Sequence, residues 1–282
     1  MCVCNLVEAA LSFPLMASSS FAQRWLFSKI GCQIYAFIIF SLGLTGIFHL
    51  VIVAVDRYLV ICKDTKVKKG SAIKGSIACW LSGILWATLP FLGWNGYIFE
   101  RAHLSCCINW YSKDPQDLSY IVTIMVFCLF VPMAVMSFTY GRIYITIKNS
   151  HQPSASTGKN SSGKFSRRKR KRQTKMLKMI IAMTVAFLLS WSPYAIVSLW
   201  AAFDDLRHIP PTSDVIPALL AKASVIWNPI IYVAMNQQFR EGFLQFIGRD
   251  IGRRQHVAAA TRSSRPRPTI LNSNGQSTTI SC

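Results

Sequence analysis

The stretch ALLAKASVIWNPIIY, residues 218–232, places a single lysine, Lys222, inside an otherwise apolar segment. A charged side chain at the centre of a membrane-spanning helix costs at least about 2.5 kcal/mol on insertion scales. Lys222 lies well inside the apolar window 215–239, so we do not interpret its ammonium as one that reaches the membrane surface. The segment therefore predicts a membrane span with a buried amine that has either a partner or a chemical modification.

Four other windows contain no Asp, Glu, Lys or Arg, and each is about 25 residues long, enough to cross a bilayer. They are residues 30–55, 75–99, 118–141 and 179–203, and residues 9–23 form a shorter and weaker candidate. Hydrophobic residues make up 52% of the 282-residue chain and charged residues 15%, which argues against an ordinary soluble domain. The sequence predicts an all-α membrane protein with several spans.

The lysines and arginines are concentrated between alternate spans. Of 31 such residues, 23 lie in residues 63–74, in residues 148–178 or after Tyr232. The positive-inside rule places those segments and the C-terminus in the cytoplasm. The run RRKRKRQTK, residues 167–175, would suggest nucleic-acid binding in a soluble chain, but beside a span we interpret it as a topology signal that contacts anionic lipid. We therefore expect a lipid bilayer as its partner, and no nucleic acid.

The first residues do not fit this topology. Six spans and a cytoplasmic C-terminus place Met1 in the cytoplasm, yet the chain begins abruptly with MCVCNLVEAALSFPLM. We expect one helix to be missing before this segment.

Three of the nine cysteines fall on the outer, oxidising side. Cys32 opens the span 30–55, and Cys106 and Cys107 lie in the long outer loop before residue 118. Because disulfides form in oxidising compartments, we expect a bridge from Cys32 to one of the other two.

Three short motifs place polar or aromatic residues within or at the ends of spans. They are Asp56-Arg57-Tyr58, Trp191-Ser192-Pro193-Tyr194 and Asn228-Pro229-Ile230-Ile231-Tyr232. For the first motif alone, a charged pair at a helix end is an equally good interpretation. Pro132, Pro193 and Pro229 each remove a backbone hydrogen bond and allow a kink. Kinks in three helices indicate a bundle that changes shape.

Together these motifs resemble the helix signatures of rhodopsin-class G-protein-coupled receptors. Trp80, and Pro132 with Tyr140, stand at the family's positions between the first and second motifs. Cys32 precedes Asp56 by 24 residues, the usual offset of the family's disulfide cysteine. The likeness runs from about residue 5 to residue 247. It implies a seven-transmembrane receptor bundle, here with about six spans because the first helix is absent.

Lys222 stands six residues before Asn228, the position at which opsins carry their retinal-binding lysine. The phrases RYLVIC, SWSPYAIVSLWAAF and LLAKASVIWNPIIY resemble the neuropsin and peropsin group of opsins more than the visual pigments. The resemblance implies retinal, 11-cis or all-trans, bound covalently to Lys222 as a Schiff base. Burial in an apolar pocket disfavours an ammonium, and a neutral amine can attack the retinal aldehyde.

A protonated Schiff base needs an anion nearby, which opsins place in the third helix or in the second outer loop. The third-helix position is Tyr35, whose phenol is neutral at pH 7. The loop position is Glu100, six residues after Trp94 and six before Cys106. The resemblance therefore implies Glu100 as the counterion, with a solvated loop acid as the plainer alternative. Pigments of this group can also keep the Schiff base deprotonated, so the absorption maximum stays open.

The same registration implies the other walls of the retinal pocket. Small and aromatic residues inside a bundle are also what an ordinary core contains, and Trp191 and Tyr194 are the most specific because they flank Pro193. The Glu100 offset also favours Cys106 as the disulfide partner of Cys32. The implied pocket consists of Tyr35, Ala36, Phe40, Gly43, Leu44, Trp110, Tyr111, Ile124, Cys128, Leu129, Trp191, Tyr194 and Ala195.

The resemblance implies a multi-pass photoreceptor of the plasma membrane that couples light-driven retinal isomerisation to a heterotrimeric G protein. On activation, we expect Arg57 to leave Asp56 and face the G protein. The likeness to neuropsins points to the inhibitory class of G protein, and Ser and Thr residues between 261 and 281 point to a receptor kinase and arrestin. The implied coupling residues are Asp56, Arg57, Tyr58, Tyr140, Asn228, Pro229, Tyr232, Asn236, Gln237 and Gln238.

We divide the chain into four parts. Residues 1–28 are a truncated start with a remnant of the second helix and an outer loop, and residues 29–235 are the bundle of helices three to seven. Residues 236–248 form an amphipathic helix on the membrane surface, and residues 249–282 form a disordered cytoplasmic tail. Gln173 stands where visual pigments carry an acid that holds Arg57, which predicts higher activity in the dark.

Other functions stay open at this point. A photoisomerase of the peropsin type would release isomerised retinal, whereas the intact motifs at Arg57 and Tyr232 favour signalling. A receptor for a diffusible ligand would have no use for Lys222. A third alternative is a truncated opsin that does not signal. We expect no enzymatic activity and no metal site.

Overall fold

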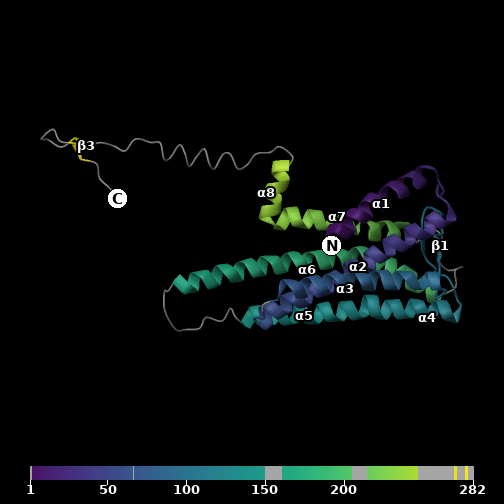
Figure 1. Cartoon of the computed structure of the whole chain (residues 1–282), viewed down its shortest axis with the longest axis horizontal. Coiled ribbons are helices and arrows are strands. Elements are labelled where there is room, and N and C mark those ends of the chain that lie inside the picture. Colours follow the sequence, from purple (N-terminus) through teal and green to yellow (C-terminus); the bar gives the residue numbers. More distant parts are fainter. Residues whose placement is uncertain are drawn as a thin grey trace. The chain divides into compact units, whose positions relative to one another are not determined.

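The computed structural model describes residues 2–65, 67–149, 161–204 and 215–246, together with the short strands at 270–271 and 277–278. The chain forms two compact units, Met1–Ile231 and Tyr232–Cys282. The first unit is almost entirely helical and contains α1 to α6 and most of α7 (Figure 1).

Five helical segments among the described residues are long and apolar enough to cross a membrane. Large apolar side chains on their outer faces are exposed, as in Leu81, Phe138 and Leu189, which suits a surface that faces lipid. The predicted all-α membrane fold is thus confirmed. The segments are α2 (Lys29–Cys62), α3 (Lys69–Thr88) with the 3-10 turn η1 (Leu89–Leu92), the segment Pro115–Asn149, the part Gln173–Phe203 of α6 (Ser161–Phe203), and α7 (Val215–Met235).

Helix α2 is the centre of the bundle and lies beside α1, α3, α5 and α6. It begins at a cap, because the Ser28 Oγ accepts a hydrogen bond from the Gly31 N–H at 3.1 Å. Helix α3 approaches α2 closely at Gly83, where an added Cβ would lie 2.8 Å from the Ser41 carbonyl oxygen. The absence of a side chain at Gly83 therefore permits this packing.

The segment Pro115–Asn149 is continuous but irregular. It consists of α4 (Pro115–Ile124), the π-helical turn η2 (Met125–Phe130) and α5 (Val131–Asn149). Pro132 has no N–H to donate to the preceding turn, and the Val131 N–H donates instead to the carbonyl of Val126, five residues earlier. The kink that Pro132 predicts therefore takes the form of a widened turn.

Helix α1 (Cys2–Phe21) contains most of the weak window 9–23 but begins before it. The hydroxyls of Ser12 and Tyr35 lie 3.0 Å apart and tie α1 to α2. Met16 packs on Tyr35 and Ile39 in a small apolar cluster. These contacts fix one face of α1 against the bundle.

A β-hairpin connects α3 to α4. Its strands β1 (Tyr97–Phe99) and β2 (Cys106–Ile108) are antiparallel, and Phe99 pairs with Cys106. A disulfide joins Cys32 to Cys106, which attaches the hairpin to α2 and confirms Cys106 rather than Cys107 as the partner. The Tyr97 hydroxyl donates to the Ala87 carbonyl at 2.7 Å, and burial raises the pKa of Tyr97, so this hydroxyl remains a donor.

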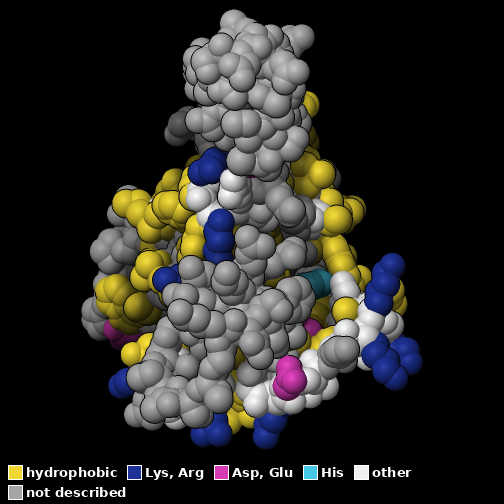
Figure 2. Space-filling view, turned by 90° about the vertical axis from the view of Figure 1, so that its left-hand side faces the viewer, with side chains coloured by type: hydrophobic (Ala, Val, Ile, Leu, Met, Phe, Trp, Pro, Cys, Tyr) yellow, Lys and Arg dark blue, Asp and Glu magenta, His cyan; other side chains and the backbone are white. Residues whose placement is uncertain are grey.

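Exposed lysines gather at the helix ends on one side of the first unit. Lys63 follows α2, Lys68 and Lys69 stand at the start of α3, and Lys148 lies near the end of α5. On the face shown in Figure 2, Lys and Arg outnumber Asp and Glu and lie next to apolar side chains. These lysines belong to the segments whose charge predicts a cytoplasmic location.

The second unit contains the end of α7, the helix α8 (Gln237–Phe246), and the paired strands β3 (Ile270–Leu271) and β4 (Ser277–Thr278). Asn236 caps α8, since its Oδ1 accepts from the Phe239 N–H at 3.4 Å. Phe239, Phe243 and Phe246 recur at helical spacing and are exposed, which suits an amphipathic helix. Apart from β3 and β4, the predicted disordered tail lies outside the described residues.

Candidate functional site

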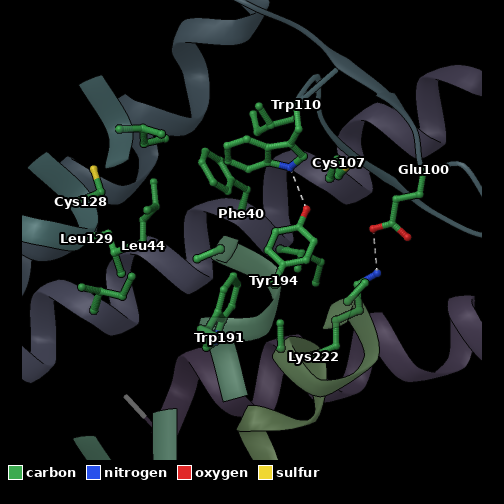
Figure 3. A pocket seen from close by; sticks show the side chains of 18 of the residues that line it. Phe40, Leu44, Glu100, Cys107, Trp110, Cys128, Leu129, Trp191, Tyr194 and Lys222 are labelled. Carbon is green, nitrogen blue, oxygen red and sulfur yellow. Dashed lines mark hydrogen bonds and ion pairs between the residues drawn. The ribbon is translucent and has the colours of Figure 1, made fainter. Parts of the chain in front are cut away.

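Lys222 is a buried cation with two polar partners. It projects from α7, and 9% of the residue is exposed. Its Nζ lies 3.2 Å from Oε1 of Glu100 and 3.0 Å from Oγ of Ser105. Figure 3 shows the Lys222 side chain directed at the Glu100 carboxylate. The structure thus places the predicted amine beside the predicted counterion.

The turn of the hairpin explains why Glu100 and Ser105 lie together. Glu100 directly follows β1 and Ser105 directly precedes β2, and the Glu100 N–H donates to the Ser105 carbonyl at 2.8 Å. Ser105 Oγ donates to Oε2 of Glu100 at 2.5 Å while it accepts from Lys222. Between them, His103 adopts a left-handed conformation with φ of 56° and closes the turn on the Glu100 carbonyl. The turn therefore presents a carboxylate and a hydroxyl to one point in the bundle.

This arrangement offsets the cost of a charge in apolar surroundings. The side chains of Lys222 and Glu100 are 11% and 12% exposed. Burying an unpaired ammonium costs much free energy, whereas burying an ion pair that has additional hydrogen bonds costs much less. The lysine within residues 218–232 therefore has the partner that its burial requires.

Lys222 and Glu100 form one wall of a cavity that is otherwise almost entirely apolar. The cavity leaves about 930 Å³ between atoms, part of it open to solvent. In Figure 3 the ion pair lies at one end of the cavity and Cys128 and Leu129 at the other, with the rings of Phe40, Trp110, Trp191 and Tyr194 between them. This shape places an amine at the end of a long apolar space.

Eleven of the thirteen predicted pocket residues line this cavity: Tyr35, Ala36, Phe40, Leu44, Trp110, Ile124, Cys128, Leu129, Trp191, Tyr194 and Ala195. Two do not. Gly43 lies behind the indole of Trp191, because a Cβ there would meet the ring at 3.3 Å. Tyr111 lines a smaller neighbouring cavity that shares Glu100 and Tyr194. Both lie beside the predicted pocket without forming its wall.

Sequence reasoning missed several residues of the wall. Ile39 and Ile47 lie on α2, Phe187 lies on α6, and Ala218 and Ala221 precede Lys222 on α7. All of these but Ala221, which directly precedes Lys222, lie three or four residues from a predicted residue, and this helical spacing could have found them. The remaining missed residues come from the hairpin and the π turn, namely Cys106, Cys107, Ile108 and Met125.

Hydrogen bonds of two tryptophans join the cavity wall to neighbouring elements. Trp110 Nε1 donates to the Tyr194 hydroxyl at 2.8 Å, which links the segment after β2 to α6. Trp191 Nε1 donates to Ser224 Oγ at 3.1 Å, which links α6 to α7 two residues from Lys222. The rings of Trp191 and Tyr194 meet edge to face with centroids 6.1 Å apart. A change in the contents of the cavity would therefore act directly on α6 and α7.

The predicted coupling residues lie away from this cavity. Arg57 forms an ion pair with its neighbour Asp56, and the ring of Tyr58 lies 6.1 Å from that of Phe138. The Tyr140 hydroxyl lies 3.0 Å from Thr184 Oγ1 and so links α5 to α6. These residues lie on α2, α5 and α6, and none of them lines the cavity.

The other predicted coupling residues lie in or after α7. Asn228 and the kink residue Pro229 are within this helix. In the second unit, the ring of Tyr232 lies 5.7 Å from that of Phe239. Asn236 caps α8 and Gln237 begins it, while the side chain of Gln238 lies outside what the structure describes.

Comparisons with known proteins agree with this geometry. The family model described as 7 transmembrane receptor (rhodopsin family) matches residues 1–232. Human visual pigment-like receptor peropsin is 34% identical over 245 residues, which cover 86% of this chain and 71% of peropsin. Parapinopsin of Ictalurus punctatus is 32% identical over 249 residues, covering 84% of this chain and 68% of parapinopsin.

A solved structure also matches this chain. The crystal structure of squid rhodopsin matches with a TM-score of 0.81 and 31% identity, covering 86% of this chain and 68% of that chain. These matches confirm the predicted receptor bundle and the predicted likeness to opsins. With the family match extending over most of its length, the chain belongs to the rhodopsin family of seven-transmembrane receptors, as an opsin-type photoreceptor protein of peropsin-like sequence.

Proposed function

We propose that this protein binds retinal and couples light-driven retinal isomerisation to a heterotrimeric G protein. The observation that carries the proposal is the Lys222 amine, paired with Glu100 at one end of an apolar cavity. A receptor for a diffusible ligand has no need of a buried amine at this position. The opsin-type sequence supports the same conclusion.

The residues present fit retinal chemically. When bound, retinal supplies a light-absorbing polyene and an aldehyde carbon to which an amine can be joined covalently. The Lys222 amine is the group for that bond, and Phe40, Trp110 and Trp191 supply aromatic walls for an apolar chain. The ion pair of Lys222 and Glu100 is confined to one end of the cavity (Figure 3), which matches a ligand with a single polar end.

Glu100 is the counterion in this proposal. Its carboxylate stabilises a positive charge on the Lys222 nitrogen, and the hydrogen bond from Ser105 orients the carboxylate. Tyr35 stands at the other position where opsins place a counterion, and it contributes a neutral hydroxyl that is hydrogen-bonded to Ser12. The charge on the nitrogen therefore depends chiefly on the hairpin.

Transmission begins at the wall that α6 and α7 share. Trp191 stacks on Phe187 with ring centroids 5.6 Å apart and donates to Ser224 of α7. A ligand that fits two arrangements of this wall unequally shifts their populations by the difference in binding free energy. Pro193 and Pro229 lack the backbone donors that would hold both helices straight.

Coupling to a G protein is supported by the intact inner motifs. The hydrogen bond between Tyr140 of α5 and Thr184 of α6 can open when these helices move apart. The ion pair of Arg57 with Asp56 lies within α2 and can open by rotation of the Arg57 side chain. A retinal isomerase has no need of them, so we favour a signalling receptor over an enzyme.

The location and remaining partners are also proposals. The exposed lysines at the inner helix ends favour a multi-pass plasma-membrane protein with a cytoplasmic C-terminus. We propose an inhibitory-class G protein as the partner, with a receptor kinase and arrestin acting on the tail, and the division at residues 28, 235 and 248 as the domain organisation.

Reductive trapping tests retinal binding. Membranes containing the protein are incubated with 11-cis or all-trans retinal in darkness and reduced with borohydride, and the labelled peptide is identified by mass spectrometry. We expect retinal on the peptide containing Lys222, no label in Lys222→Ala, and unchanged labelling in Lys74→Ala, which removes an exposed lysine of α3. Equal labelling of wild type and Lys222→Ala would contradict the proposal.

Nucleotide loading tests signalling. Illuminated membranes are mixed with purified inhibitory-class G protein, and guanine nucleotide uptake is measured beside the release of isomerised retinal. We expect light-dependent uptake that is lost in Arg57→Ala, although this variant still forms the pigment. Release of isomerised retinal without nucleotide uptake by any class of G protein would instead identify a photoisomerase.

A further inference from the structure

Glu8 of α1 is a buried acid with no part in the ion pair of Lys222 and Glu100. It is 5% exposed. Its Oε1 is buried and accepts no hydrogen bond from any residue that the structure describes. A buried carboxyl group without hydrogen bonds is unfavourable, and far more so when it is ionised. The burial of this carboxyl group therefore needs a physical explanation.

The surroundings of Glu8 connect it to the Lys222 site. A negative charge on Glu8 would be attracted by the Lys222 ammonium. One helical turn further along α1, the Ser12 hydroxyl is hydrogen-bonded to the hydroxyl of Tyr35, and Tyr35 lines the cavity that contains Lys222. Helix α1 therefore carries a buried carboxyl group one turn from its hydrogen bond to the cavity wall, independently of the hairpin.

Glu100 and Glu8 differ in the hydrogen bonds that their carboxyl groups accept. Glu100 accepts hydrogen bonds from both Lys222 and Ser105. Oε1 of Glu8 has no comparable donor within the described residues. When two carboxyl groups share a single cation in apolar surroundings, they do not both ionise, and the one with more hydrogen bonds is the anion. This balance makes Glu100 the anion and leaves Glu8 with its proton.

We propose that Glu8 is the second acid of the Lys222 site, neutral while Glu100 is ionised and available as the anion when Glu100 is removed. In that second state the Glu8 proton passes to solvent, and the charge on the Lys222 nitrogen keeps a partner. The neutral state of Glu8 is a property of the retinal-free protein, whereas the effect of Glu8 on a pigment rests on the proposed function.

Infrared spectroscopy of the retinal-free protein tests the neutral acid. The chain contains three glutamates, Glu8, Glu100 and Glu241, so ¹³C labelling of glutamate carboxyl groups marks few candidates. We expect one isotope-sensitive carbonyl band of a neutral carboxylic acid in the wild type. The band should be lost in Glu8→Gln and retained in Glu241→Gln, which removes an exposed acid of α8. A wild type without such a band, or a band that survives in Glu8→Gln, would overturn the proposal.

Two further variants keep the test decisive if Glu8→Gln does not fold. Glu8→Asp retains the acid, so its band should persist but lose its sensitivity to glutamate labelling. Glu100→Gln should lose the band, because Glu8 then ionises to pair with Lys222. A labelled band that persists unchanged in Glu8→Asp would assign the neutral acid elsewhere and overturn the proposal.

The pigment gives an independent readout. With retinal bound, Glu100→Gln should keep the positive charge on the Lys222 nitrogen at neutral pH, because Glu8 supplies the anion. The double variant Glu8→Gln/Glu100→Gln should lose this charge, which would be seen as a loss of the visible absorption band. Equal spectra for the single and double variants would count against Glu8. If borohydride finds no retinal on Lys222 while the infrared band still depends on Glu8, the proposed function fails and the second acid stands.

Discussion

The Nζ of Lys222 and the Oε1 of Glu100 lie 3.2 Å apart, although 122 positions separate the two residues in the sequence. Lys222 belongs to α7, whereas Glu100 is held by a hairpin that the disulfide at Cys106 attaches to α2. The ion pair therefore joins α7 to the hairpin and, through the disulfide, to the central helix α2. Its removal should affect the stability of the fold as well as the chemistry of the amine.

Replacing Glu100 with Gln should lower the free energy of unfolding of the retinal-free protein by about 3 kcal/mol, since removal of one partner leaves a buried charge uncompensated. We place the loss at the lower end of the expected range because Glu8 can supply an anion. The double variant Lys222→Met/Glu100→Gln removes both charges and should recover most of this loss. Thermal unfolding in detergent, followed by circular dichroism, measures both. An additive further loss in the double variant would show that the pair itself contributes little.

The disulfide should matter for both the fold and the pocket. It closes a loop between residues 74 positions apart, so Cys106→Ser should cost about 4 kcal/mol by the entropy of the released chain. The freed hairpin would also place Glu100 less firmly against Lys222. Cys107→Ser is the matched control and should retain the bridge, as peptide mapping under non-reducing conditions can establish. Equal unfolding temperatures for Cys106→Ser and the wild type would contradict this expectation.

Gly83 marks the closest approach of α3 to α2. In Gly83→Ala the new methyl group would meet the Ser41 carbonyl at 2.8 Å and the Thr45 N at 3.0 Å, both of them backbone atoms that cannot simply rotate away. We expect a loss of about 1–3 kcal/mol from this overpacking. Gly141→Ala on α5 meets nothing within 4 Å and should gain up to about 1 kcal/mol from helix propensity. The two variants should therefore shift the unfolding temperature in opposite directions.

Features that follow from a fixed offset along one helix were predictable from the sequence. The spans, Lys222 and the residues around Trp191 lie where charge-free windows and motif spacing place them. The contact of Ser105 with Glu100 was not predictable, because it depends on the turn conformation at His103. Nothing in the spacing of a short loop determines which of its hydroxyls reaches a buried amine.

Two other misses have physical causes. The apolar window in α1 begins at residue 9 because Glu8 precedes it, so the criterion that located spans also excluded a buried acid. Pro132 predicts a kink but not its form, and the π turn carries one residue more than an α-helical turn.

Lys113 should stabilise the C-terminal end of α6. Its Nζ donates to the carbonyls of Ala201 and Ala202 at 2.9 Å and of Asp204 at 2.6 Å, in the last turn of the helix, where carbonyl groups lack partners within the helix. Lys113→Met should cost about 1–2 kcal/mol locally and speed amide hydrogen exchange across 199–204 roughly five- to thirtyfold. Lys113→Arg retains donors and should exchange nearly as the wild type does. Because α6 carries Trp191 and Tyr194, a less stable C-terminal end should also weaken the hydrogen bond from Trp110 to Tyr194. Unchanged exchange in Lys113→Met would show that the carbonyls find water equally well and that this lysine does not hold the helix.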